Sequence, residues 1–234
     1  RDTANTFLTL QQNTGYLNLN RSLVLPNTTG STIGILYKET DRFIHNYQAP
    51  GTTGQNIFIG INSGNFTMSG TSIDASQNTA VGNFTLNGLT TGSSNSAFGY
   101  NSLKGTTTGF NNSAFGFGSL QTNSTGNDNS AFGLLSLLIN TTGSNNSSFG
   151  VSSLESNTTG SYNCAFGNSS LMSNTTGSSN TGVGDQCLSL KTTGSGNSAF
   201  GSGSLNSLTG GNFNTAIGNS SGSQLTSGNN NITI

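Results

Sequence analysis

The chain has 234 residues, enough for one large domain. Only 6% of these residues are charged and the formal net charge is -1, so the chain lacks the basic surface that nucleic-acid binding requires. No apolar run approaches the ~18 residues of a membrane-spanning helix. We therefore expect no nucleic-acid partner and no insertion into a membrane.

Residues 1–62 contain short apolar runs but no fixed repeat. Ile33–Tyr37 and Arg42–Tyr47 are apolar segments on either side of a polar turn, a pattern that predicts two strands. Two further apolar runs precede them, at Leu17–Leu19 and Leu23–Leu25. His45 is the only histidine of the chain, and we expect it to have a structural role. The sequence thus predicts a small N-terminal β cap or connector over residues 1–62, followed by a repeat domain over residues 63–234.

A 17-residue repeat without insertion or deletion occupies most of the second domain, and a constant period of this size is typical of one structural unit stacked on itself. Its clearest marker is a large apolar residue followed by glycine. The marker occurs at Val81-Gly82, Phe98-Gly99, Phe115-Gly116, Phe132-Gly133, Phe149-Gly150, Phe166-Gly167, Val183-Gly184, Phe200-Gly201 and Ile217-Gly218. Each unit also has one asparagine, one very small residue, one leucine and a turn that often reads Asn-Thr-Thr-Gly.

The composition of the unit favours strands over helices, because glycine, serine, threonine and asparagine are poor helix formers. In Asn-Ser-Ala-Phe-Gly, the side chains alternate across a strand, so that Ser and Phe point one way and Asn and Ala the other. We expect a strand, a bend at glycine, a second short strand ending near leucine, and a turn. Stacking about ten such coils at ~4.8 Å gives an all-β, parallel β-solenoid or β-roll about 50 Å long.

Stacked coils place equivalent residues above one another, so each column has one expected role. Asparagine side chains in register can hydrogen-bond amide to amide as a ladder. This ladder is expected at Asn95, Asn112, Asn129, Asn146, Asn163, Asn180, Asn197 and Asn214. The large apolar columns are expected to form a core stack inside the coil, made of Phe98, Phe115, Phe132, Phe149, Phe166, Phe200, Leu103, Leu120, Leu137 and Leu154.

The column of very small residues, such as Ala97 and Ala114, lies opposite the phenylalanine side of the strand. A uniformly small residue there indicates that this second side is also closely packed. A coil from another copy of the chain would explain the packing, as in a homotrimer. A tight bend within one chain is the alternative.

Two cysteines, Cys164 and Cys187, fall in different columns of the repeat. We expect two buried small side chains; a disulfide or a metal site is the minority alternative, because no second cysteine or histidine stands at ligand spacing. Asn140, Asn157 and Asn174 begin Asn-Thr-Thr sequons. They are candidate glycosylation sites if the chain passes through a secretory pathway, or turn residues chosen for their local hydrogen bonds.

The run at residues 142–150, Thr-Gly-Ser-Asn-Asn-Ser-Ser-Phe-Gly, followed by Ser-Leu and Asn-Thr-Thr-Gly, resembles the repeats of phage and viral tail-fibre proteins. It is also similar to the head repeats of trimeric autotransporter adhesins, whose strands carry an Asn-Ser-x-Ala-Ile-Gly type of motif. Residues 214–218, Asn-Thr-Ala-Ile-Gly, are the copy most similar to that motif. The resemblance covers residues 55–234 and implies a trimer of parallel β-rolls that serves attachment or display at a surface.

Enzymatic function requires side chains that converge, and the repeat disperses them. Asp128, Glu155 and Asp185 occupy three different columns in separated coils, so they do not form paired carboxylates. A single histidine in the N-terminal region offers no Ser-His-Asp set. We expect no enzymatic activity, no cofactor, and no catalytic or metal site.

The sequence therefore predicts a structural and adhesive fibre segment on a virion or cell surface, which associates with itself as a homotrimer and binds a host receptor or glycan. A self-assembling extracellular filament of rods joined end to end is the alternative, because exposed β-edges favour such contacts. An ice-binding solenoid is a second alternative, based on the regular threonine columns. These columns look interrupted at residues 123–125 and 208–210.

Overall fold

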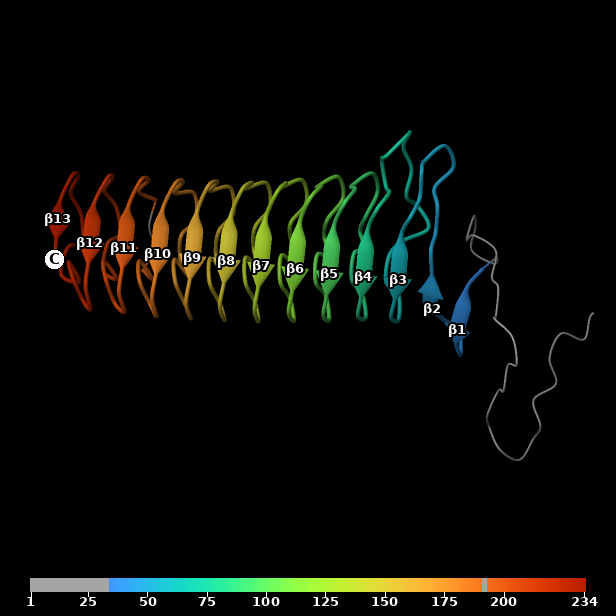
Figure 1. The fold of residues 1–234 in the computed structure, drawn as a ribbon, viewed down its shortest axis with the longest axis horizontal. Coiled ribbons are helices and arrows are strands. Elements are labelled where there is room, and N and C mark those ends of the chain that lie inside the picture. The colour runs from blue at the N-terminus through green and yellow to red at the C-terminus, as the bar shows by residue number, and fades with distance from the viewer. Residues whose placement is uncertain (1–33, 191–192) are drawn as a thin grey trace, which may run out of the picture.

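The computed structural model describes residues 34–190 and 193–234, which form a rod-shaped β-solenoid (Figure 1). Its 13 strands belong to one sheet and follow one another in chain order along the long axis. This confirms the expected all-β, parallel solenoid with a 17-residue repeat. The strands considered at Leu17–Leu19 and Leu23–Leu25 lie outside the described residues.

The N-terminal end of the sheet is antiparallel. β1 (Leu36–Lys38) and β2 (Asp41–His45) form a hairpin, and β2 pairs in antiparallel fashion with β3 (Ile57–Ile59). The two strands expected on either side of the polar turn are thus confirmed. Parallel pairing begins between β3 and β4, so the coil geometry is already present at Ile57, before the boundary expected at residue 63.

From β4 onward each coil contributes one short strand to the sheet. These strands are β4 (Thr79–Val81), β5 (Ser96–Phe98), β6 (Ser113–Phe115), β7 (Ser130–Phe132), β8 (Ser147–Phe149), β9 (Cys164–Phe166), β10 (Thr181–Val183), β11 (Ser198–Phe200), β12 (Thr215–Ile217) and β13 (Ile232–Thr233). Equivalent residues pair directly, as Ala97 with Ala114 and Phe98 with Phe115. The sequence repeat is therefore the structural repeat.

The second strand that we expected near each leucine is absent from the described residues, where a series of turns takes its place. Gly99, Asn101 and Leu103 have φ angles of 127°, 58° and 49°, so alternate residues are left-handed. This alternation curls the backbone too tightly for a strand. The bonds between coils nevertheless continue, since the Leu103 N–H donates to the Ser119 carbonyl at 3.0 Å.

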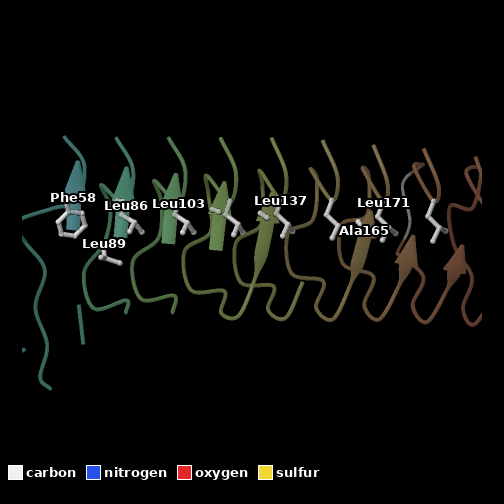
Figure 2. Close-up of a cluster of buried hydrophobic side chains, with 14 of the residues drawn as sticks. Phe58, Leu86, Leu89, Leu103, Leu137, Ala165 and Leu171 are labelled. Atoms are coloured by element: carbon white, nitrogen blue, oxygen red, sulfur yellow. The ribbon is translucent and has the colours of Figure 1, made fainter. Parts of the chain in front are cut away.

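The core is the narrow interior of the coil, along which the leucine column runs in a line (Figure 2). The fully buried leucines of this column are Leu86, Leu103, Leu120, Leu137, Leu154, Leu171, Leu188 and Leu205. The alanine column of the strands belongs to the same buried cluster. The small residues thus pack inside their own chain, which is the alternative to packing against another copy.

The phenylalanine column lies on the outer face of the sheet, so its placement in the core was wrong. The strand alternates as expected, but Ala97 is the buried residue of β5 while Phe98 is only partly buried. The interior already holds one leucine and one or two asparagines per coil, and this leaves room opposite for a methyl group only. The phenylalanines that lie on the outer face are Phe98, Phe115, Phe132, Phe149, Phe166 and Phe200.

Sequence changes inside the coil compensate one another because the interior has little spare volume. Cys187 stands where most coils have serine, and Gly182 stands where they have alanine. A Cβ on Gly182 would lie 2.9 Å from Cys187 Sγ and 2.7 Å from Ser170 Oγ, closer than non-bonded atoms approach. The coil accommodates the Cys187 thiol because Gly182, in the same layer, lacks the methyl group that alanine would place there.

Candidate functional site

A ladder of buried asparagines runs along the inner side of the sheet, at the start of each strand. The Asn112 side-chain amide donates to Asn95 Oδ1 at 3.1 Å and to the Gly126 carbonyl at 2.9 Å, and the Asn112 backbone N–H donates to the same Oδ1 at 3.0 Å. The backbone bond recurs at Asn95, Asn112, Asn129, Asn146, Asn163, Asn180, Asn197 and Asn214. Each asparagine therefore ties its own coil to the preceding one and to the turn that follows it in the chain.

A second, shorter ladder lies inside the turn and consists of Asn123, Asn140, Asn157 and Asn174. Asn140 donates to Asn123 Oδ1 at 2.7 Å and to the Gly143 carbonyl at 2.9 Å. Asn157 and Asn174 repeat this arrangement. This second ladder was not predicted, although the same 17-residue spacing of asparagine marks it in the sequence.

The second ladder overturns the proposed glycosylation of Asn140, Asn157 and Asn174. All three side chains are fully buried, and the amide nitrogen that would carry a glycan donates hydrogen bonds within the coil. A glycan at these positions is incompatible with this fold. The interpretation as turn residues, whose side chains bond to the local backbone, fits the geometry.

Thr106 occupies the same column one coil before Asn123, and its buried Oγ1 has no hydrogen-bond partner. We expect Thr106→Asn to extend the second ladder, because its Oδ1 would face the Asn123 amide and its own amide would face the Gly109 carbonyl. The predicted gain in unfolding free energy is about 0.5–1.5 kcal/mol, measured by denaturant titration. Thr106→Val removes the unpaired hydroxyl without adding a ladder bond, so equal gains from both variants would contradict the prediction.

The outer face of the sheet carries a stack of aromatic rings. The Phe98 and Phe115 ring centroids are 4.7 Å apart with an interplanar angle of 7°. The stacking continues through Phe132 and Phe149 to Phe166, with spacings of 4.7 to 4.8 Å. Val183, Phe200 and Ile217 extend the column and are exposed.

A second apolar column lies just beyond the glycine bend, beside the first. It consists of Tyr100, Phe117, Leu134 and Val151, all of which are exposed. Asn168 and Asp185 then occupy the same position, so the column becomes polar in the C-terminal coils. We call the two columns together the outer stripe.

Another side of the solenoid presents hydroxyl groups at the coil spacing. The exposed residues are Thr108, Thr125, Thr142, Thr159, Thr176 and Thr193. Their hydroxyls make no hydrogen bond to any residue that the structure describes. The residues before four of them donate instead to a carbonyl of the next coil, as where Thr141 Oγ1 donates to the Thr158 carbonyl at 2.9 Å; these residues are Thr107, Ser124, Thr141 and Thr158. The interruption expected at residues 123–125 does not affect the outward column, because Thr125 holds its place.

His45 lies buried at the N-terminal end of the rod and is held as a neutral ring. Its Nε2 lies 2.8 Å from the Ser63 carbonyl, to which it donates, and its Nδ1 accepts the Tyr47 N–H at 3.3 Å. Burial lowers the pKa of His45 to about 4; the Ser63 hydrogen bond opposes this shift and the nearby Arg42 charge adds to it. The ring also packs 4.8 Å from Phe58, so its surroundings are those of a core residue.

We expect the N-terminal end to lose stability as the pH falls from 6.5 to about 4. In this range the unfolded chain binds a proton at His45 and the folded chain does not, so unfolding becomes easier with falling pH. The shift corresponds to about 3 kcal/mol at full effect. Hydrogen exchange of the Gly60 amide, which donates to the Phe43 carbonyl at 2.7 Å, measures it against pH. The His45→Phe variant should lack this dependence, and an unchanged pH profile in that variant would assign the effect to the carboxylates.

The other titratable groups of the described residues do not converge. Cys164 and Cys187 are free thiols, the first partly buried and the second buried, and burial raises the pKa of both. No group of three or more His, Cys, Asp or Glu side chains able to hold a metal is found within residues 34–190 and 193–234. The same residues contain no helix long and apolar enough to cross a membrane.

Comparisons with known proteins add no relative: no family, no curated protein and no solved structure matches this chain. The functional interpretation therefore depends on the geometry described above.

Proposed function

We propose that this chain is a structural and adhesive segment of an extracellular fibre, displayed on a virion or cell surface and assembled as a homotrimer. The observation that supports this best is the uninterrupted stacking of coils, with two asparagine ladders inside and backbone hydrogen bonds between every pair of neighbours. Such a molecule resists bending, since bending must stretch hydrogen bonds that run along the rod axis. It also offers a protease few accessible extended segments.

The N-terminal hairpin serves this role as a cap. A terminal coil of a solenoid presents an open strand edge that invites uncontrolled pairing. β2 pairs with the edge of β3 in antiparallel fashion. Arg42 belongs to β2, and its guanidinium carbon lies 4.4 Å from the centroid of the Phe66 ring. We propose that this arrangement blocks the end-to-end growth that a filament of rods would require.

Adhesion would involve side chains outside the two ladders and the core. Tyr162 and Phe213 are exposed aromatic residues in one column at the corner before the strand, and the threonine column provides free hydroxyls nearby in the chain. Aromatic faces and hydroxyls are the groups that bind sugars, so a receptor glycan is the ligand class that fits them. A glycan array probed with the fluorescent chain tests this part of the proposal, and uniform absence of binding would reject it.

Measuring the mass of the purified chain in solution, together with electron microscopy, tests the fibre proposal. We expect three times the mass of 23.8 kDa and discrete, unbranched rods. A monomer at all accessible concentrations would contradict the trimer. Long filaments formed by end-to-end contacts would favour the homopolymer instead.

The threonine column favours ice binding as a second candidate function. Ice presents oxygen atoms at a regular repeat, and a rigid face with hydroxyls at one fixed spacing is the feature that such a surface requires. The column is continuous from Thr108 to Thr193 and ends at Gly210. Thermal hysteresis of the purified chain, compared with that of a Thr142→Tyr variant, tests this candidate; absence of hysteresis would reject it.

A further inference from the structure

We propose that copies of this chain associate side by side through the outer stripe, parallel and in register, with the widest contact over the coils of β5 to β8. The inference rests on the proposed homo-oligomeric fibre and specifies its contact face and direction. The partner is a second copy of the same chain.

The exposed apolar area of the outer stripe is larger than a monomer ordinarily leaves uncovered. Its exposed members range from 37% for Val183 to 50% for Phe117 and Ile217. Side chains of this kind have about 150–250 Å² each, so the eight exposed members leave roughly 500–900 Å² accessible on one copy. The largest patch on a typical monomer is about 300–600 Å², whereas a stable interface covers about 800 Å² per partner. The stripe is therefore of interface size.

The regular spacing of the stripe matches a second copy better than an unrelated protein. The rings of Phe98 to Phe166 repeat every 4.7 to 4.8 Å, and a surface that packs against each ring must repeat at the same distance. Another solenoid of this chain has that repeat. The two columns also contain a single charge, Asp185, so no like charges oppose contact in the N-terminal coils.

The change from apolar to polar residues in the second column sets the direction. In a parallel, in-register arrangement every coil meets the same coil, so Phe117 meets Phe117. Asp185 then meets Asp185, but it does so at the polar end of the second column, where both carboxylates stay in contact with water. A fully overlapping antiparallel arrangement would bury Asp185 against Phe117, which removes water from a charge without a partner. A staggered antiparallel arrangement avoids this contact but places Phe200 and Ile217 beyond the parallel coils of the partner. The parallel arrangement covers the most apolar area.

Cysteine cross-linking distinguishes these arrangements. The background carries Cys164→Ser and Cys187→Ser, which restore the usual serine of each column. Tyr100→Cys should form a disulfide with itself between copies in the parallel arrangement. In an antiparallel arrangement, Tyr100→Cys cross-links only with a second variant. This variant is Val151→Cys in the staggered arrangement and Ser202→Cys in the fully overlapping one. Either result would overturn the inference. Thr142→Cys, on the hydroxyl side, is the control that should not cross-link.

A second measurement uses a polar version of the stripe. Leu134→Asn with Val151→Asn copies Asn168, which the chain itself carries in this column, so the coil tolerates the change. We expect association to weaken by more than about tenfold with an unchanged circular dichroism spectrum. The control Thr142→Asn should leave association unchanged. An oligomer that persists in the double variant and does not cross-link at Tyr100→Cys would overturn the inference and leave the fibre proposal standing, whereas a monomeric unaltered chain would overturn both.

Discussion

Replacing Gly133 by alanine is expected to break the stacking of the rod at mid-length and to lower the free energy of unfolding by more than about 4 kcal/mol. Gly133 has a φ of 136°, a conformation that residues with a side chain rarely adopt. An added Cβ would overlap the carbonyl oxygen of Gly150 in the next coil. The added Cβ is bonded to the Gly133 backbone and the oxygen belongs to the Gly150 backbone, so neither atom can move unless the two coils separate.

Gly210→Ala is the matched control for this prediction. The chemical change is the same, but no atom lies within 4 Å of the Cβ that would be added at Gly210. We expect its stability to remain within about 0.5 kcal/mol of the unaltered chain. Denaturant unfolding of both variants measures the difference. Similar losses in both variants would show that the close approach of coils at Gly133 is not the cause, because the effect of Gly→Ala on the unfolded chain is stabilising.

Asn146→Ala is the second substitution with a large expected effect, a loss of about 3–5 kcal/mol. The Asn146 amide donates to Asn129 Oδ1 at 3.1 Å and to the Gly160 carbonyl at 2.9 Å. Its Oδ1 accepts the Asn163 backbone N–H at 3.0 Å and the Asn163 amide at 3.1 Å. Alanine leaves these buried groups without partners and without water, and each unpaired group costs about 1–3 kcal/mol.

The control for the ladder is Thr142→Ala, because the Thr142 side chain is exposed and its hydroxyl has no partner among the described residues. Its effect should stay within about 0.5 kcal/mol. Hydrogen exchange locates the damage: the Asn163 amide should exchange faster in Asn146→Ala and unchanged in Thr142→Ala. Equal stability of the two variants would mean that the ladder specifies register without contributing to stability.

Much of the fold could be predicted because the repeat is strict. A column of equivalent residues every 17 positions requires coils of constant length, and alternation in Asn-Ser-Ala-Phe-Gly requires a strand there. The hairpin at 36–45 followed from two apolar segments around a polar turn. The buried asparagines at strand starts were likewise visible, since stacked amides satisfy each other in a dry interior.

Other features escaped prediction because alternation does not say which side of a strand is inside. Phe98 is larger and more apolar than Ala97, and hydrophobicity alone places the ring in the core. The volume left beside Leu103 and the asparagines decides otherwise, and that volume exists only once the coil has closed. The same closure turns Asn140 inward, which no sequon pattern reveals.

The sequence by itself determined the period, the strand position and the register, because these depend on spacing along the chain. Only the tertiary structure decided which columns fill the interior and which remain on the surface, because that depends on the radius of the coil. The left-handed turn at Leu103 closes the coil so tightly that one leucine, one small residue and the amides fill each layer. The aromatic rings are thereby left outside, where they form the outer stripe.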